Sequence, residues 1–384
     1  MLELKYRTKY IFALLTSFTI FVLLYESYNF KFSRPSYINQ LLLTPRHKQS
    51  NQSQQYNYTL HIITVSDVER QKNYQQHSSS VFCYAHRHGY QFSVINPHDY
   101  HMCSNITNFY FKKHCAVIMY FIQHPFIDWL VVLDGDTFIV NATRSLDRFI
   151  PRDPNIHVIH YERFIDNEIM AGNYIIRNHP WSLLYLYKWT NYFTKISNIG
   201  YHNHDNGALH LHFIDMIGID NQTYNKCASL YNVSHHEGFY MDYVACTKCA
   251  LKGRRKFEHI ILYRRAHGFC RDDGPLPHRI HYLDTFMHGF KGNLNHFYEE
   301  PINTSACTGI PNWTPKIRQS LIINDTQNAK LLTKQWEQEA SRRYPSTVMY
   351  PEVGNCWPDC EIEMTGDALK SFTIRICNNP KFKT

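Results

Sequence analysis

The stretch WLVVLDGDTFIV, Trp129 to Val140, decides the fold class. Five apolar residues lead into Asp134, a glycine and Asp136, and the chain then becomes apolar again. An apolar run of this length before a turn is typical of a buried strand. Two carboxylates at the end of such a strand are costly to bury unless a positive charge lies between them. The stretch therefore raises the possibility of a cation at a strand end.

The residues before this stretch predict two further strands and two helices. The segment YTLHIITVSD supplies a β run from Leu60 to Val65, and the polar segment after it suits a helix that ends near Gly89. QFSVIN, residues 91–96, is a second short strand, and KKHCAVIMYFIQHP, residues 112–125, is helical in pattern. Alternating strands and helices predict an α/β fold with a largely parallel sheet, which places ligands at the carboxyl ends of its strands. The two aspartates lie at such an end.

The pattern continues downstream and sets the domain boundaries. Residues 170–193 predict a short strand followed by a helix from Pro180. Residues 203–218 predict a loop that leads into a helix, and residues 327–344 predict another helix. We divide the chain into the following parts: cytosolic tail 1–10, transmembrane signal anchor 11–25, stem 26–57, catalytic domain 58–300, and a cysteine-containing C-terminal extension 301–384.

Composition narrows the class of protein. The 384 residues are 44% hydrophobic and 15% aromatic, which is sufficient for a sizeable core. The formal charge of +8 is modest for this length, and the chain has no long run of Lys or Arg. This argues against a nucleic-acid binder and is compatible with a locally basic pocket for an anionic ligand.

The N-terminus predicts a membrane anchor. Lys5, Arg7 and Lys9 precede the uncharged apolar span from Ile11 to Tyr25, and no small-x-small cleavage site follows. An uncleaved anchor with its basic end in the cytosol follows from this asymmetry, and a cleaved secretory signal is the alternative. Asn-x-Ser/Thr glycosylation sequons then begin at Asn51, Asn57, Asn105, Asn141, Asn221, Asn232, Asn303, Asn312 and Asn324. All follow the apolar span, so we expect the rest of the chain in the lumen.

The 11 cysteines fit an oxidising compartment and predict several disulfides with at least one odd thiol. The CTKC segment, Cys246 to Cys249, could indicate zinc or redox chemistry, but it lacks a second CxxC pair. We therefore favour structural disulfides for it and for Cys356, Cys360 and Cys377. The pairing does not follow from the sequence.

Several interpretations of the aspartate pair compete. An EF-hand needs a third oxygen ligand where apolar Phe138 stands. A phosphohydrolase with a nucleophilic aspartate would place Thr or Val at that same position, whereas Thr137 comes one residue early. Two aspartates one residue apart can instead share Mn²⁺ or Mg²⁺, whose remaining positions phosphate oxygens fill. A solvated pair of loop carboxylates is the alternative without a function.

Five segments carry a resemblance to a known group of proteins: YAHRHGYQF (84–92), KKHCAVIMYFIQHPFIDWLVVLDGDTFIVN (112–141), NEIMAGNYIIRNHPWSLLYLYKW (167–189), HDNGAL (204–209) and HGFKGN (288–293). In order and spacing they resemble Golgi glycosyltransferases of the fungal and plant galactosyl-, mannosyl- and xylosyltransferase type. Within those, the chain looks most like a nematode-expanded family carrying domain of unknown function 273. The resemblance covers roughly residues 58–300.

The resemblance implies a nucleotide-diphospho-sugar transferase fold of the type called GT-A, and transfer with retention of anomeric configuration. Asp134, Asp136 and His288 would hold Mn²⁺ or Mg²⁺, and His281 is the alternative to His288. Lys291 could neutralise a phosphate, or could simply be a solvated surface lysine. A nucleotide sugar would be the donor, with UDP favoured.

Further residues acquire expected roles. Thr64, Val65 and Ser66 would contact the nucleotide base and ribose, and Lys113 would contact the donor phosphates or sugar. The alternative is that these residues have no role beyond forming the strand and the helix. In the segment MAGNYIIRN, Ala171, Gly172 and Asn173 would form a small-residue turn near the donor sugar, with the Asn173 amide on its hydroxyls. Asp205 would face the reacting carbon or orient the acceptor, with Asn206 beside it, and an ordinary helix N-cap is its alternative role.

Taken together, the sequence predicts a type II, single-pass Golgi membrane glycosyltransferase. It would transfer a hexose or pentose to a glycan or glycoprotein acceptor. A catalytically silent lumenal protein of the same fold, which binds glycans or scaffolds other enzymes, is the alternative. A lumenal phosphohydrolase is disfavoured by Phe138.

Overall fold

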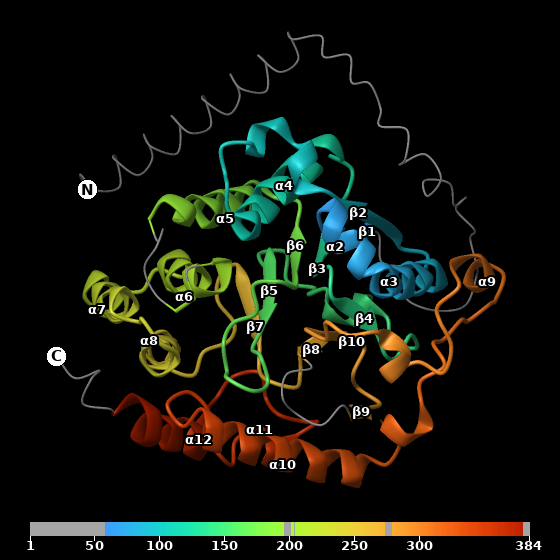
Figure 1. The fold of residues 1–384 in the computed structure, drawn as a ribbon. Coiled ribbons are helices and arrows are strands. Elements are labelled where there is room, and N and C mark those ends of the chain that lie inside the picture. The colour runs from blue at the N-terminus through green and yellow to red at the C-terminus, as the bar shows by residue number, and fades with distance from the viewer. Residues whose placement is uncertain (1–57, 196–200, 203, 273–278, 379–384) are drawn as a thin grey trace. The chain divides into compact units, whose positions relative to one another are not determined.

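The computed structural model describes residues 58–195, 201–202, 204–272 and 279–378 (Figure 1). Internal contacts divide the chain into Met1–Gln49 and Ser50–Thr384, and every described residue belongs to the second unit. The predicted tail, anchor and stem, residues 1–57, lie outside the described part. Within the described ranges, no helix combines the length and apolar character needed to span a membrane.

A six-stranded mixed sheet forms the centre of this unit. Its order is β2 (Gln91–Ile95), β1 (Leu60–Val65), β3 (Trp129–Asp134), β6 (Tyr174–Arg177), β5 (Val158–Tyr161) and β7 (Ile260–Tyr263). Strand β6 runs antiparallel to both β3 and β5, and the other neighbours pair in parallel. The predicted α/β fold with a mostly parallel sheet is confirmed, and β6 is the exception.

The register of the sheet brings the carboxyl ends of its first strands together. Val65, the last residue of β1, is paired with Ile95 of β2 on one side and with Asp134 of β3 on the other. The first five residues of β3 are buried and Asp134 is half-buried. An apolar run therefore carries the first aspartate to the edge of the sheet, where its charge reaches solvent.

Helices cover both faces of the sheet. Alternate residues of β3 point to opposite faces: Leu130 and Val132 pack with α4, α5, α6 and α8, whereas Val131 and Leu133 pack with α3. The helices are α2 (Val68–Asn73), α3 (Gln75–His88), α4 (Phe109–Gln123), α5 (Pro180–Asn191), α6 (Asp205–Met216), α7 (Asn221–Asn232) and α8 (Glu237–Ala250). The predicted helix before Gly89 is divided at Tyr74 into α2 and α3, and Gly89 ends α3 with φ +72°, a conformation that glycine adopts readily.

Small sheets and single turns complete the fold. Strand β10 (Phe286–His288) lies between β4 (Thr137–Ile139), to which it is antiparallel, and β8 (Cys270–Asp272), to which it is parallel. Strand β9 (Ile280–His281) pairs with β11 (Ile322–Ile323). The short 3-10 turns are Pro97–Asp99, His101–Cys103, Leu146–Phe149, Tyr192–Thr194, Leu294–His296 and Gln319–Leu321, and Thr373–Cys377 forms a π-helical turn.

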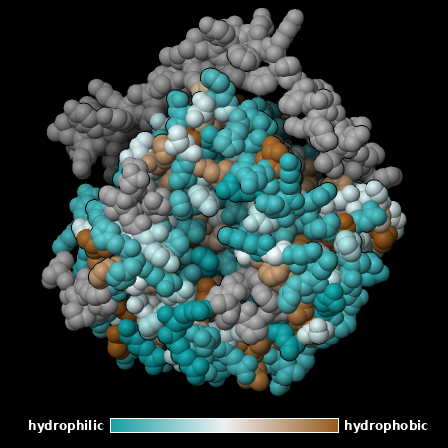
Figure 2. All heavy atoms as spheres, in the orientation of Figure 1, coloured by the Kyte–Doolittle hydropathy of each residue, from teal (hydrophilic) through white to brown (hydrophobic). Residues whose placement is uncertain are grey.

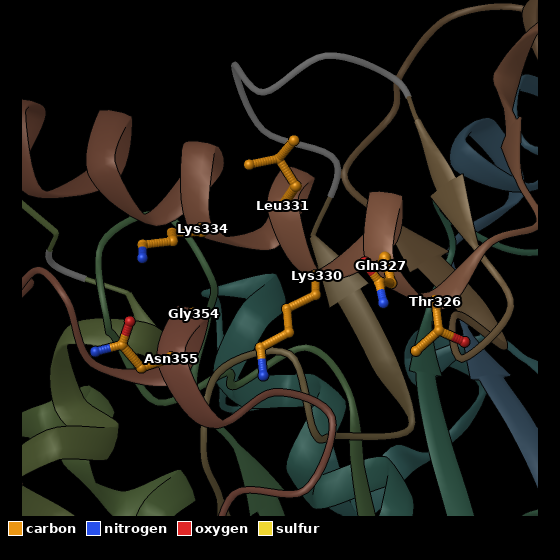
Figure 3. A pocket seen from close by; sticks show the side chains of 7 residues that line it. All are labelled: Thr326, Gln327, Lys330, Leu331, Lys334, Gly354 and Asn355. Carbon is orange, nitrogen blue, oxygen red and sulfur yellow. The ribbon is translucent and has the colours of Figure 1, made fainter.

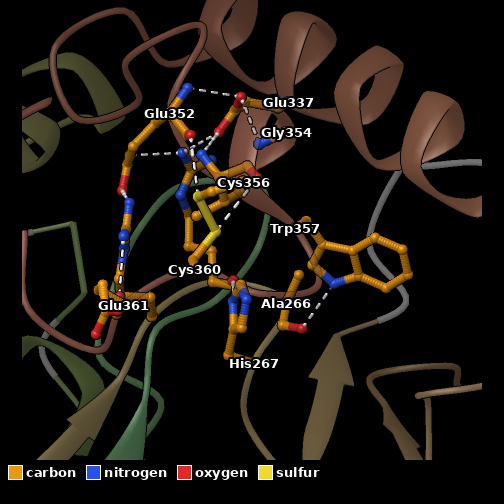
Figure 4. The surroundings of a disulfide bond; sticks show 12 residues. Ala266, His267, Glu337, Glu352, Gly354, Cys356, Trp357, Cys360 and Glu361 are labelled. Atoms are coloured by element: carbon orange, nitrogen blue, oxygen red, sulfur yellow. Dashed lines mark hydrogen bonds and ion pairs between the residues drawn. A yellow bond between two sulfur atoms is a disulfide. The ribbon is translucent and has the colours of Figure 1, made fainter.

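The C-terminal helices pack on the sheet domain through buried ion pairs. They are α9 (Thr304–Thr308), α10 (Thr326–Arg343), α11 (Val353–Cys356) and α12 (Gly366–Phe372). Arg265, just beyond β7, lies 2.8 Å from Glu337 of α10 and 2.7 Å from Glu352. The Glu337 carboxylate also accepts the backbone N–H groups at the start of α11, including that of Gly354 (Figure 4). The predicted helix at residues 327–344 is thus confirmed as α10, and it is anchored to the β7 end of the sheet.

Ten of the 11 cysteines form disulfides: Cys83–Cys307, Cys103–Cys115, Cys227–Cys246, Cys249–Cys377 and Cys356–Cys360, the last shown in Figure 4. Cys270 is the odd thiol, and it is buried. The two cysteines of the CTKC segment therefore belong to two different disulfides, as structural cysteines. They are therefore bonded to other cysteines, not to each other, and are not free to bind zinc.

Candidate metal centre

The predicted ligands Asp134, Asp136 and His288 come together beyond the carboxyl end of β3. The His288 Nε2 atom lies 3.2 Å from Asp136 Oδ1 and 3.5 Å from Asp134 Oδ2. One possible ligand atom from each residue falls within 4.8 Å of the others. The antiparallel pairing of β10 with β4 explains the meeting, because it sets His288 opposite Thr137, the residue after Asp136. All three side chains remain partly exposed, at 25%, 13% and 12% respectively.

Two other residues from the same sequence region lie elsewhere. His281 is buried, 3.3 Å from Asp284, and its ring packs against Trp357 with centroids 4.7 Å apart. It does not join the three-residue group, so the structure selects His288 over His281. Lys291 follows β10 and is exposed to solvent, in keeping with the simple alternative of a surface lysine.

Lys113 lies behind the cluster as a buried cation. Its Nζ atom is 3.0 Å from Asp134 Oδ1 and 3.0 Å from Asp205 Oδ2, and its side chain is only 1% exposed. Burial alone would lower the pKa of Lys113, but the two carboxylates outweigh burial and raise it. Burial would raise the pKa of Asp134, but Lys113 and His288 hold it below its ordinary value. Lys113 therefore keeps the Asp134 carboxylate ionised.

Asp205 lies on the other side of Lys113 from Asp134. It is the first residue of α6, and its side chain is 5% exposed. Its Oδ2 accepts hydrogen bonds from Lys113 and, at 3.2 Å, from His114, while its Oδ1 accepts the N–H of Asn206 at 3.0 Å. Both oxygens are engaged within the protein, where Asp205 holds Lys113 in place, and its catalytic role stays a prediction. The expected helix start is confirmed, with His204 rather than Asp205 at the N-cap.

The side chains of Asn173 and Asn206 accept hydrogen bonds from backbone N–H groups. Asn173 is fully buried, and its Oδ1 accepts the N–H of Asp134 at 2.8 Å and the hydroxyl of Thr137 at 3.1 Å. The Asn206 Oδ1 accepts the N–H of Ala171 at 3.2 Å. Asn173 therefore fixes the turn that carries both aspartates, and its contact with sugar hydroxyls stays a prediction.

Residue 172 must be glycine because it lies so close to the Asp134 carboxylate that a side chain would collide with it. A Cβ atom at this position would lie 2.0 Å from Asp134 Oδ2 and 2.4 Å from the methyl carbon of Met170. Contacts this short do not occur between real side chains, so only glycine leaves the carboxylate where it is. The small-residue turn makes room for the Asp134 carboxylate, and its approach to the donor sugar stays a prediction.

The predicted nucleotide-contacting residues of the first strand lie beside the cluster but are buried. Thr64, Val65 and Ser66 are each at most 2% exposed. A Cβ on Gly135, between the two aspartates, would lie 3.2 Å from Ser66 Oγ. The end of β1 therefore supports the aspartate turn, and its contact with a nucleotide stays a prediction.

Sequence reasoning missed two charged residues on the far side of His288. Asp272 Oδ1 lies 2.7 Å from His288 Nδ1, and Asp272 Oδ2 lies 2.8 Å from Arg163 Nε. Burial alone would lower the pKa of His288, but the surrounding carboxylates, led by Asp136, hold it well above its ordinary value. Asp272 stands next to a second aspartate in the sequence, with no motif around it, so nothing marked it out.

A separate pocket of about 410 Å³ lies at the C-terminal helices (Figure 3). Lys330 and Lys334 of α10 and Asn355 of α11 line it, together with Thr326, Gln327, Leu331 and Gly354. It contains none of the predicted site residues. On the face shown in Figure 2, hydrophilic residues predominate among the described atoms, and hydrophobic ones are scattered.

Comparison with solved structures finds only weak similarity, whereas comparison with protein families finds a clear match. No curated protein matches the chain. A glycosyltransferase involved in the glycosylation of the major capsid of PBCV-1 is 12% identical over 60% of this chain and 93% of that chain, with a TM-score of 0.38. The glycosyltransferase GlyE of Streptococcus pneumoniae TIGR4 is 15% identical over 44% of this chain and 47% of its own, with a TM-score of 0.28. A197 from STIV is 10% identical over 39% and 74% of the two chains, with a TM-score of 0.22.

TM-scores of this size are too low to assign a fold or an activity, and we draw neither from these proteins. The sequence comparison is stronger. A family described as "Protein of unknown function, DUF273" matches residues 81–303, which is more than half of the chain and extends from within α3 to beyond β10. The chain belongs to the DUF273 family.

Proposed function

We propose that this chain is a metal-dependent glycosyltransferase that uses a nucleotide sugar, with UDP favoured as the nucleotide. It would transfer a hexose or pentose to a glycan or glycoprotein acceptor, on a fold of the GT-A type. The observation that carries the proposal is the convergence of Asp134, Asp136 and His288 at the carboxyl edge of the sheet.

The donor set fits Mn²⁺ or Mg²⁺. Two carboxylates and one imidazole offer hard oxygen ligands and one nitrogen, a combination that suits Mn²⁺ better than Ca²⁺. The three side chains are partly exposed, which leaves room for ligands that the protein does not supply. When bound, the cation would supply positive charge to the diphosphate leaving group as the sugar bond breaks.

The chain's own residues keep this arrangement ready. Lys113 holds Asp134 ionised and Asp205 holds Lys113, so the nearer carboxylate stays charged and fixed. Asn173 ties the backbone of Asp134 to Thr137, and Gly172 leaves the space that the carboxylate needs. Preorganised charge of this kind is the largest single contribution in many enzymes that stabilise a developing anion.

The proposal includes a place in the cell: the Golgi membrane, with type II topology and a lumenal catalytic domain. The basic residues before the apolar span at residues 11–25 support this orientation. Five disulfides favour an oxidising compartment. Six sequons start at exposed asparagines, namely Asn105, Asn221, Asn232, Asn303, Asn312 and Asn324. Protection from protease in intact microsomes, together with sensitivity to glycosidase, tests the topology.

Activity is tested by hydrolysis of a panel of nucleotide sugars by the full-length chain, with and without Mn²⁺. We expect metal-dependent turnover of one donor, and we expect Asp136→Asn to abolish it because one of three metal-ligand side chains loses its charge. Asp367→Asn, at an exposed position in α12, is the matched control and should keep full turnover.

The outcomes separate the proposal from its alternative. Equal metal dependence in wild type and Asp136→Asn would remove the metal assignment. Binding of a nucleotide diphosphate without any turnover would instead indicate a silent lumenal protein. Retention of configuration, which we also propose, is tested by the anomer that proton NMR detects in the first product formed.

A further inference from the structure

The imidazole of His288 lies between two sets of carboxylates. Its Nε2 atom faces Asp136 and Asp134, at 3.2 and 3.5 Å. Its Nδ1 atom faces Asp272 Oδ1 at 2.7 Å. We propose that Asp272 is a positioning residue of the metal centre, which accepts the Nδ1–H of His288 and thereby directs Nε2 toward the cation. This inference rests on the proposed function, because it concerns the same metal.

The chemistry of histidine makes such a partner useful. A neutral imidazole carries one proton, on either nitrogen, and only the other nitrogen can bind a metal. A carboxylate at Nδ1 fixes the proton there and leaves the Nε2 lone pair free, and it also raises the electron density of the ring. Asp272 is suited to this task because its side chain is only 3% exposed, so water does not compete for the proton.

The backbone places Asp272 where it can act. Strand β8 runs parallel to β10, and the register pairs Asp272 directly with His288. The two residues are the last of their strands. Their proximity therefore follows from the pairing of β8 with β10, which places Asp272 and His288 side by side on neighbouring strands.

Arg163 in turn fixes the second oxygen of Asp272. Its Nε lies 2.8 Å from Asp272 Oδ2, and its Nη1 lies 2.7 Å from Glu168 Oε2. Asp272 thus bridges a guanidinium and an imidazole, and it cannot turn away from either without breaking a buried charged contact. The same segment between β5 and β6 continues to Gly172 and Asn173, so one stretch of chain supports both the His288 side and the Asp134 side of the centre.

A purely structural role for Asp272 would be to neutralise Arg163. That need is already met in part, because Arg163 also pairs with Glu168 and, at 3.4 Å, with Asp166. A structural role predicts lower stability for any substitution at Asp272 and unchanged metal affinity. The positioning role predicts an effect on metal affinity that depends on whether the new side chain can accept the Nδ1–H of His288.

Two variants of the full-length chain separate these roles by calorimetric titration with Mn²⁺ and by thermal melting. Asp272→Leu has similar volume but accepts no hydrogen bond, so Mn²⁺ should bind on the order of 10- to 100-fold more weakly. Asp272→Asn keeps an acceptor oxygen without charge, and neutral acceptors bond less strongly, so we expect a smaller loss of several-fold. Asp284→Asn is the matched control: Asp284 is equally buried and pairs with Arg271 at 2.8 Å, away from His288, and Mn²⁺ affinity should stay unchanged.

Each outcome either supports or overturns the positioning role of Asp272. Graded loss in the order wild type, Asp272→Asn, Asp272→Leu, with an unaffected Asp284→Asn, supports the inference. Wild-type affinity in Asp272→Leu overturns it, and so does an equal loss in Asp284→Asn, which would show a general packing effect. If Asp272→Leu does not fold, wild-type affinity in Asp272→Asn overturns it. If the wild-type chain binds neither Mn²⁺ nor Mg²⁺, the proposed function fails, and the inference fails with it.

Discussion

Gly172→Ala offers the sharpest test of the metal centre, because one methyl group should displace a ligand. The added Cβ would lie 2.0 Å from Asp134 Oδ2, and ordinary contact begins at 3.4 Å. The carboxylate oxygen must therefore retreat by about 1.4 Å, whereas a metal site tolerates errors of about 0.2 Å in its ligand distances. The displaced oxygen is the one nearer to His288, at 3.5 Å. We expect Mn²⁺ affinity to fall at least about 100-fold, equivalent to about 2.7 kcal/mol.

Titration with Mn²⁺ measures this loss, and urea unfolding measures the cost to the fold, which we expect at about 1–3 kcal/mol for overpacking. Met170 also obstructs the added methyl group, with its Cε 2.4 Å away, so the double variant Gly172→Ala, Met170→Ala removes that contact alone. The double variant should still bind Mn²⁺ weakly. Gly309→Ala, whose added Cβ would meet nothing closer than 3.6 Å, is the control. Wild-type Mn²⁺ affinity in Gly172→Ala would refute the reasoning.

Two further predictions concern stability. Lys113→Met leaves two carboxylates without their buried cation and should lower the free energy of unfolding by about 3–5 kcal/mol in urea. Lys188→Met, in an exposed pair, should cost under about 1 kcal/mol, and a similar small change at Lys113 would contradict the assigned role. Burial and neighbouring histidines lower the pKa of His157 to about 4, and burial lowers that of His281 to about 4, from 6.5. The unfolded chain therefore takes up these protons first, so their contribution to stability is complete above about pH 6.5 and is lost as pH falls toward 4. Thermal melts at pH 7.5 and 4.5 check this, and equal melting temperatures would count against it.

The strands, the aspartate pair and the helix end at Gly89 could be predicted because local pattern determines them. An apolar run ending in Asp-Gly-Asp has few structural solutions, and β3 has the expected bounds and burial. The direction of β6 could not be predicted. Its sequence, Tyr174–Arg177, is apolar like that of a parallel strand, and its direction depends on where the segment from β5 returns to the sheet.

The site was predicted where residue type limits the role, and missed where the partner decides it. Asp134 and Asp136 are residue types that bind metals and lie at a predicted strand end, whereas His288 was expected from the family resemblance, and the pairing of β10 with β4 brings it to them. Asn173 and Asp205 are equally suited to contact a substrate or to hold the protein. Only the three-dimensional structure shows the partners that they have within the protein, a backbone N–H for Asn173 and Lys113 for Asp205.

The metal centre also has a consequence for how the chain reaches its folded state. Asp136 and His288 lie far apart in the sequence, and they meet only after β10 has docked between β4 and β8. Closing so long a segment carries its entropic cost before any contact at the centre can form. A cation bound at this proposed site would therefore not nucleate folding, but it would stabilise the folded protein by binding the native state alone. A translation product truncated before β10 would lack His288 and would keep only the two aspartates of the proposed site.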